Sequence, residues 1–166
     1  MNVIQSWDTA IKAASDNDAS VCLTFQQVNG ESGPEHRLIN VWLGRMEYPD
    51  LKRKIVELAQ GYQPDMVLIE DKASGQSLIQ DLKREGLLSV IGIVPKGDKV
   101  TRFARVTPMI EAGQVALPHY ASWLSGFEHE IMQFPNGKHD DQVDAPSQYL
   151  NWFRQKRWGQ LRVRSV

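Results

Sequence analysis

The run Met66-Val-Leu-Ile-Glu-Asp-Lys-Ala-Ser-Gly75 joins a short apolar segment to two consecutive acidic residues. Met66 to Ile69 has the length and composition of a strand that is buried on both faces. Beyond the acids, apolar residues recur at helical spacing from Ser77 to Glu85, and Gly86 is a typical helix stop. A buried strand that is followed by a helix indicates the parallel part of an α/β sheet.

The segments before and after Met66 to Gly75 differ in the spacing of their apolar residues. Upstream, Val3 to Trp7, Ser20 to Val28 and His36 to Met46 predict three strands in an antiparallel meander. Downstream, further strands are predicted from Val90 to Val94 and from Gln114 to Leu117. Helices are predicted at Pro49 to Gly61, Ser77 to Glu85, Lys99 to Ala112, Trp123 to Met132 and Asp141 to Lys156. We therefore expect an α/β fold in which helices flank a mixed sheet, made of this meander and of parallel strands.

The composition predicts one soluble, intracellular domain. The 166 residues suit a single domain, and 42% hydrophobic with 23% charged residues is normal for a chain with a core. A lone cysteine, Cys22 in an apolar run, excludes a disulfide framework and a cysteine zinc site. No signal peptide is visible, and no apolar run approaches the roughly 20 residues that cross a bilayer. We expect about residues 1–157 to be folded and 158–166 to form a tail.

Acidic residues recur where predicted strands end and where the last helix begins. They are Asp8, Glu70 and Asp71 after strands, and Asp140, Asp141 and Asp144 at the helix. Strand ends are where α/β proteins commonly bind ligands. Asp141 and Asp144 are spaced i, i+3 and are expected to share one helix face.

Several converging carboxylates are what phosphodiester hydrolysis with two divalent ions requires. Mg²⁺ prefers oxygen ligands, and two ions about 3.5–4 Å apart can activate water and stabilise the leaving oxygen. The alternative is structural, because acids after strands often serve turns and Asp140 or Asp141 could cap the helix. Spacing alone leaves both interpretations open.

Four runs together resemble a known family, and their order along the chain is also that of the family. They are Val67 to Gly75, Val94 to Arg102, Glu111 to Pro118 and Gly137 to Ala145, after Trp7-Asp8-Thr9 near the start. This set resembles the C-terminal nuclease domain of the large terminase subunit of tailed bacteriophages. The resemblance implies a ribonuclease H-like fold, shared with retroviral integrases and Holliday-junction resolvases.

The resemblance also implies a site and an activity. Catalytic acids are expected at Asp8, Glu70 and Asp141, which with Asp144 would hold two Mg²⁺ or Mn²⁺ ions. Glu70 is preferred over Asp71 because successive strand residues point to opposite faces. The implied activity is cleavage of double-stranded concatemeric phage DNA, with little sequence preference, during genome packaging.

Two departures from the family pattern affect this expectation. Pro146 lies in the last predicted helix, where it crowds the preceding turn, so the geometry of Asp144 and the choice among Asp140, Asp141 and Asp144 stay open. The chain has no Gly-x-x-x-x-Gly-Lys-Ser/Thr loop, so the packaging ATPase is absent from it. The expected partners are double-stranded DNA, that ATPase domain in cis, the portal and the small terminase subunit, with no membrane, in the cytoplasm of the bacterial host.

Basic residues cluster in one region although the net charge is −1. Lys96, Lys99, Arg102 and Arg105 follow a predicted strand, and Lys72 lies beside Glu70. These side chains are expected to contact DNA phosphates, which supply most sequence-independent affinity. A solvated helix face is the equally open alternative.

Two other functions fit the same residues. A resolvase- or transposase-like enzyme would keep the chemistry, and a resolvase would dimerise and prefer branched DNA. A module that only docks on DNA or on the packaging motor would need no acids, whereas Asp8, Glu70 and Asp141 are all present. A panel of DNA substrates separates these functions.

Overall fold

The computed structural model describes residues 2–10, 19–30, 33–137 and 140–160, and all its strands join in one sheet. The strands are β1 (Asn2–Asp8), β2 (Ser20–Gly30), β3 (Gly33–Gly44), β4 (Met66–Glu70), β5 (Val90–Ile93) and β6 (Val115–Ala116). The helices are α1 (Tyr48–Tyr62), α2 (Ala73–Arg84), α3 (Lys99–Ala104), α4 (Thr107–Glu111), α5 (Leu124–Gln133) and α6 (Asp144–Gln160).

The sheet is mixed, with the strand order β5-β4-β1-β2-β3-β6. β1, β2 and β3 pair antiparallel, so the predicted meander is confirmed. β4 lies parallel to β1, β5 lies parallel to β4, and β6 pairs parallel with the other edge at β3. The expected α/β fold class is therefore confirmed.

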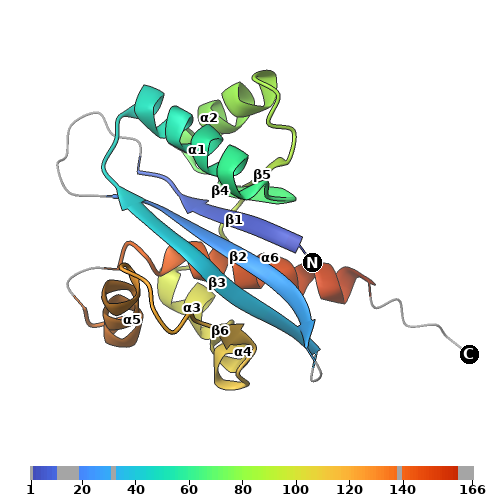
Figure 1. Ribbon diagram of the computed structural model, residues 1–166, viewed down its shortest axis with the longest axis vertical. Helices are drawn as coiled ribbons and strands as arrows, with labels where there is room; N and C mark the ends of the chain where they lie inside the picture. The colour runs from blue at the N-terminus through green and yellow to red at the C-terminus, as the bar shows by residue number, and fades with distance from the viewer. Residues whose placement is uncertain (1, 11–18, 31–32, 138–139, 161–166) are drawn as a thin grey trace, which may run out of the picture.

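Helices cover both faces of this sheet, as Figure 1 shows: α1 and α2 lie on one side, and α6 with α3 to α5 lies on the other. Residues of β1 divide between two cores in strict alternation. Trp7 packs with residues of α1 and α2, whereas Ile4 packs with Tyr149 and Leu150 of α6. The same alternation turns Ser6 and Asp8 of β1 toward the α6 side.

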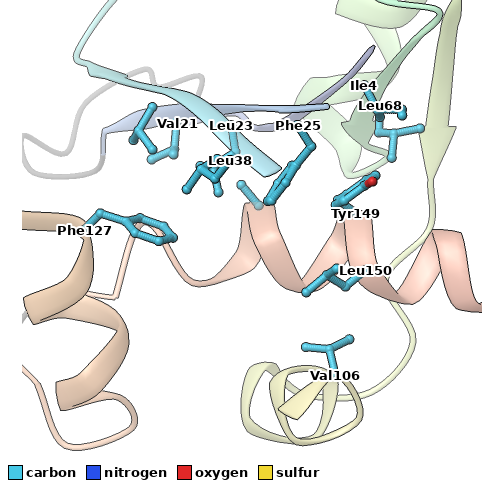
Figure 2. Packing of buried hydrophobic residues seen from close by; sticks show 12 residues of the cluster. Ile4, Val21, Leu23, Phe25, Leu38, Leu68, Val106, Phe127, Tyr149 and Leu150 are labelled. Atoms are coloured by element: carbon cyan, nitrogen blue, oxygen red, sulfur yellow. The ribbon is translucent and has the colours of Figure 1, made fainter. Parts of the chain in front are cut away.

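α6 is buried by contacts on two sides (Figure 2). Tyr149 stacks on Phe25 of β2 with ring centroids 4.3 Å apart, and its hydroxyl is hydrogen bonded to Nδ1 of His36 at 2.6 Å. Leu150 points away from the sheet toward Val106, in the turn between α3 and α4. The last long helix therefore joins the sheet to α3 and α4.

The single helix predicted from Lys99 to Ala112 is wrong, because the structure has α3 and α4 in its place. Pro108 has no N–H to bond to the carbonyl of Ala104, and its ring would crowd that carbonyl in a continuous helix. Proline is instead accommodated in the first turn of a new helix, which is where α4 places Pro108. Asp98 caps α3 by accepting a hydrogen bond from the Thr101 N–H at 2.8 Å.

The start of the last helix also differs from the prediction. α6 begins at Asp144 and not at Asp141, so these two residues do not share a face of one helix. Pro146 falls in the first turn, where a backbone N–H has no partner within the helix. α6 continues to Gln160, past the expected start of the tail at residue 158, and residues 161–166 lie outside the described part.

Cys22 is fully buried in the core beside α1 and α2. Among the helices of the described residues, none combines the length and the apolar character that a membrane span requires.

Candidate active site

A cavity lies where the ends of β1 and β4 meet the first turn of α6. Its walls include the three carboxylates Asp8, Glu70 and Asp144. Its other lining residues are Ile93, Val94, Pro95, Lys96, Arg102, Arg105, Gln148, Asn151, Trp152 and Gln155. Acidic, basic and amide side chains thus surround one space.

The sheet brings the first two carboxylates together. Asp8 is the last residue of β1 and Glu70 the last of β4. The strands are parallel neighbours with Trp7 opposite Ile69, so their carboxyl ends adjoin. Asp144 reaches the same place as the first residue of α6, whose chain crosses under β1 and β4. Glu70 and Asp144 are only 5% and 8% exposed, so their charges interact through protein more than through water.

The carboxyl group of Asp8 responds to this crowding. Burial raises its pKa to about 7, and the negative charges of Asp144 and Glu70 contribute in the same direction, against the opposing charge of Lys72. A hydrogen bond between Asp8 and Glu70 also raises this pKa, since two carboxyl groups can share a hydrogen bond only when one is protonated. The three acids therefore form one electrostatic unit.

Cations from neighbouring segments balance these acids. Lys72 Nζ lies 2.6 Å from Glu70 Oε2. Lys99 Nζ lies 3.0 Å from Asp144 Oδ2, and Arg102 donates a hydrogen bond to Asp144 Oδ1. Burial alone would lower the pKa of Lys99, but Asp144 and then Asp140 outweigh it and the pKa is raised.

The predicted acids are thus only partly brought together. Asp8, Glu70 and Asp144 line the cavity, whereas Asp141 is not among its lining residues. Asp141 is half-buried on the turn that precedes α6. Asp140, on the same turn, is 3.1 Å from Lys99 Nζ through its carboxylate.

The predicted cations divide in a similar way. Lys96 and Arg105 are exposed at the rim of the cavity, where Arg105 donates a hydrogen bond to the carbonyl of Lys96 at 3.1 Å. Arg102 also lines the cavity, but with Lys99 it points its charge at Asp144. Lys72 reaches the site through its ion pair with Glu70.

A divalent ion such as Mg²⁺ requires oxygen donors that converge on one point. Across residues 2–10, 19–30, 33–137 and 140–160, no three His, Cys, Asp or Glu side chains are arranged tightly enough to form a ready-made metal site. The acids of the cavity nevertheless offer only carboxylate oxygens, which suit Mg²⁺ and Mn²⁺. In the structure, Lys72, Lys99 and Arg102 supply the positive charge beside them.

The turn before α6 is held by a buried carboxylate that the sequence did not single out. Glu130 of α5 is 8% exposed. It accepts one hydrogen bond from the backbone N–H of Gln142 at 2.5 Å and another from Gln142 Nε2 at 2.7 Å. Such hydrogen bonds to a charged acceptor are strong, so this contact fixes the approach to Asp144.

Three polar residues of α6 after Asp144 were also missed by sequence reasoning. Gln148, Asn151 and Gln155 line the cavity together with the expected Asp144. Their spacing of i, i+4, i+7 and i+11 puts them on one side of the helix, next to the buried Tyr149. A polar stripe that begins at an acidic residue was the available signal.

The Terminase RNaseH-like domain family model matches residues 5–152. The chain belongs to this family. The matched range includes Asp8, Glu70 and Asp144, together with the basic segment from Lys96 to Arg105. No match was found among curated protein sequences.

Solved structures of phage terminase nucleases share the fold of this domain. The large terminase nuclease of thermophilic phage G20c with bound zinc matches with a TM-score of 0.65 and 19% identity, over 92% of this chain and 81% of the other. The same nuclease with bound magnesium gives a TM-score of 0.69 and 15% identity, over 90% and 80%. The ribonuclease H-like fold expected from the resemblance is therefore confirmed.

A nuclease of another kind is also similar. The Fowlpox virus Holliday junction resolvase matches with a TM-score of 0.54 and 16% identity, over 93% of this chain and 99% of the other. A complex of that resolvase with Holliday junction DNA gives a TM-score of 0.53 at 16% identity, over 93% and 98%. Nucleases of two kinds thus share this domain's fold.

Proposed function

We propose that this terminase RNase H-like domain is a divalent-metal-dependent endonuclease that cuts double-stranded phage DNA concatemers during genome packaging. The observation that carries the proposal is the meeting of Asp8, Glu70 and Asp144, from distant parts of the chain, in one cavity that basic residues border. Membership of the terminase family and the magnesium and zinc named for the G20c nuclease support it.

The proposed ligands of two Mg²⁺ or Mn²⁺ ions are Asp8, Glu70 and Asp144. When bound, such ions activate a water molecule and stabilise the leaving oxygen of the phosphodiester. Asp8 interacts electrostatically with both Glu70 and Asp144, which favours it as the shared ligand. Asp141 is retained as a secondary ligand, because it lies only three residues before Asp144.

The chain's own cations would hold the substrate. Lys96 and Arg105 are exposed at the cavity rim, so both are proposed to contact DNA phosphates, with Lys72 on the Glu70 side. Lys99 and Arg102 are proposed to act mainly on Asp144, because both are ion paired with it. The proposed partners are the packaging ATPase, the portal and the small terminase subunit, in the cytoplasm of the bacterial host.

A plasmid nicking assay tests this function. We expect no cutting in EDTA and restored cutting with Mg²⁺ or Mn²⁺, with Mn²⁺ at least as effective because Mg²⁺ demands near-ideal octahedral geometry. Asp8→Asn, Glu70→Gln and Asp144→Asn should each lose nearly all activity. Asp141→Asn is the matched comparison, three residues before Asp144 and outside α6, and should be milder. Full cutting in EDTA, or wild-type cutting by Asp144→Asn, would contradict the proposal.

Resolution of branched DNA is the second candidate, favoured by the Fowlpox virus resolvase fold. A resolvase should cut a four-way junction in preference to a linear duplex of the same sequence, and should do so as a dimer. Equal cutting of both substrates by a monomer would favour the terminase function. A module that only docks on DNA or on the motor would leave both substrates intact in Mn²⁺.

A further inference from the structure

A hydrogen-bond network beside the three carboxylates joins α6, which carries Asp144, to β1 and β4, which carry Asp8 and Glu70. Gln148 Nε2 lies within hydrogen-bond distance of Ser6 Oγ at 3.0 Å, the Trp7 carbonyl at 3.3 Å and the Leu68 carbonyl at 3.4 Å, so its two N–H groups are shared among three acceptors. Ser6 Oγ in turn donates to the Ala145 carbonyl at 2.7 Å. One amide group therefore contacts β1 and β4, and one hydroxyl contacts the first turn of α6.

The groups of this network lie close in sequence to the three acids. Gln148 lies one helical turn after Asp144, on the same side of α6. Ser6 lies two residues before Asp8 on the same strand face, and Leu68 two residues before Glu70. Each hydrogen-bonding group of the network thus lies within four residues of one of the three carboxylates.

The chemistry of the network fixes the orientation of the amide. The Trp7 and Leu68 carbonyls only accept, and the Ser6 hydroxyl has given its proton to Ala145. The amino group of Gln148 must therefore face the sheet, and its carbonyl oxygen is the part of the amide that this network does not use. Neither a carboxylate nor a thioether at position 148 could donate a hydrogen bond to any of these acceptors.

We propose that Gln148 is a positioning residue that sets the separation of Asp8, Glu70 and Asp144, with Ser6 as its partner. The inference rests on the proposed metal-dependent function, because this separation governs whether the acids can hold two ions. Partners of metal ligands typically change metal affinity about 10–100-fold when they are removed. Gln148 acts through the backbone of the elements that carry the ligands, and not by contact with the reacting phosphate.

A matched control is available on the opposite face of the same strand. Gln5 is fully buried on β1, and its Nε2 donates to the Leu58 carbonyl of α1 at 3.1 Å. Gln5→Met and Gln148→Met therefore each remove an amide hydrogen-bond donor that contacts backbone, and each keeps a side chain of similar length. Only the second removes a link between β1, β4 and α6.

The experiment measures Mn²⁺ binding by calorimetry, melting in EDTA, and crystal structures of wild type, Gln148→Met and Gln5→Met. We expect Gln148→Met to weaken Mn²⁺ binding at least tenfold and Gln5→Met to stay within about twofold of wild type, although both melt lower. If Gln148→Met does not fold, Ser6→Ala removes one hydroxyl of the same network and should weaken Mn²⁺ binding several-fold.

Several results would overturn the inference. Wild-type Mn²⁺ affinity in Gln148→Met, or equal losses in Gln148→Met and Gln5→Met, would reduce Gln148 to a general stabilising residue. Wild-type protein that binds Mn²⁺ without cutting DNA would defeat the proposed function and leave this comparison valid. If wild type binds no Mn²⁺, the crystal structures decide, and unmoved carboxylates in Gln148→Met would refute positioning.

Discussion

The carboxyl group of Asp8 has the most altered environment among the acids of the cavity. Burial raises its pKa to about 7, and Asp144 and Glu70 add to the effect. Below about pH 7 the neutral form is therefore favoured in the folded domain without metal, and the folded state binds this proton more tightly than the unfolded chain does. Asp8 consequently lowers stability as the pH rises from about 4 through about 7.

The first prediction is a pH-dependent gain from Asp8→Asn in EDTA. At pH 8 the variant should be more stable than wild type, by at most about 4 kcal/mol from the difference between pKa 3.8 and about 7. Near pH 3 the two proteins should be nearly equally stable, because Asp8 is then largely neutral in both states. Urea unfolding across this pH range measures the difference. A variant that is less stable than wild type at pH 8 would refute the electrostatic account.

Arg102 is the residue that balances Asp144 most directly. The side chains of Arg102 and Asp144 are 15% and 10% exposed, so this ion pair is largely desolvated. Removing one partner of such a pair leaves the other charge buried without full compensation. Lys99 remains beside Asp144 and limits that cost.

We therefore predict that Arg102→Met destabilises the domain in EDTA by about 1–3 kcal/mol. Saturating Mn²⁺ should recover much of this loss, since the ion replaces the missing positive charge at Asp144. Arg53→Met is the control, because Arg53 forms only an exposed ion pair with Asp50 and should cost less than about 0.5 kcal/mol. Equal losses of unfolding free energy in the two variants would show that the Arg102–Asp144 ion pair stabilises the domain no more than an exposed pair does.

Among the secondary-structure elements, the close packing of α2 on the end of β4 explains why Gly75 follows Glu70 in the sequence. A Cβ atom added at Gly75 would lie 2.3 Å from the Glu70 carbonyl oxygen, closer than any side chain allows. The first turn of α2 thus packs directly on the backbone of the residue that supplies a carboxylate to the cavity. Glycine is required here for close approach of two backbones.

We predict that Gly75→Ala destabilises the domain by about 1–3 kcal/mol and weakens Mn²⁺ binding, because α2 and Glu70 must move apart. Gly61→Ala in α1 is the matched control. A Cβ there meets nothing within 4 Å, so alanine should be neutral or stabilise by up to about 1 kcal/mol. Thermal melts with and without Mn²⁺ compare them. A neutral Gly75→Ala would contradict the close approach.

At the scale of the whole molecule, the site joins strands and a helix that are far apart in sequence, so an ion bound there should hold the domain together. A ligand that binds only the folded state stabilises it by about 2.7 kcal/mol at a hundred times its Kd. The ion would also relieve repulsion among Asp8, Glu70 and Asp144.

We therefore predict that Mn²⁺ raises the melting temperature of wild type in a concentration-dependent manner. Asp8→Asn should show a much smaller increase, because it lacks the ligand proposed to be shared by the ions. Added NaCl of equal ionic strength controls for screening. An equal rise in Asp8→Asn and wild type would place the stabilising ion elsewhere on the domain.

The local features of this protein follow from its amino-acid sequence. The many β-branched and aromatic residues of β2 and the apolar run of β4 predicted a strand of the meander and the buried parallel strand, because such side chains pack well on a sheet. Asp8 and Glu70 were placed at strand ends by the same kind of pattern. The resemblance of four runs supplied the family, which the match to residues 5–152 confirms.

Which side chains meet in the cavity depends on how the helices pack on the sheet. It placed Asp144 in the cavity, left Asp141 off its walls, and began α6 at Asp144, with Pro146 in the first turn. A signal for this start was present, since proline favours the first turn of a helix, but an i, i+3 spacing cannot say where a helix begins.

Contacts between distant residues were beyond any local pattern. Ser6 meets Ala145, and Gln148 meets Leu68, across 139 and 80 residues of chain. Period and propensity describe how neighbours in sequence interact, whereas these pairs form only when the sheet and α6 pack together. The spacing of the carboxylates is therefore a property of that packing.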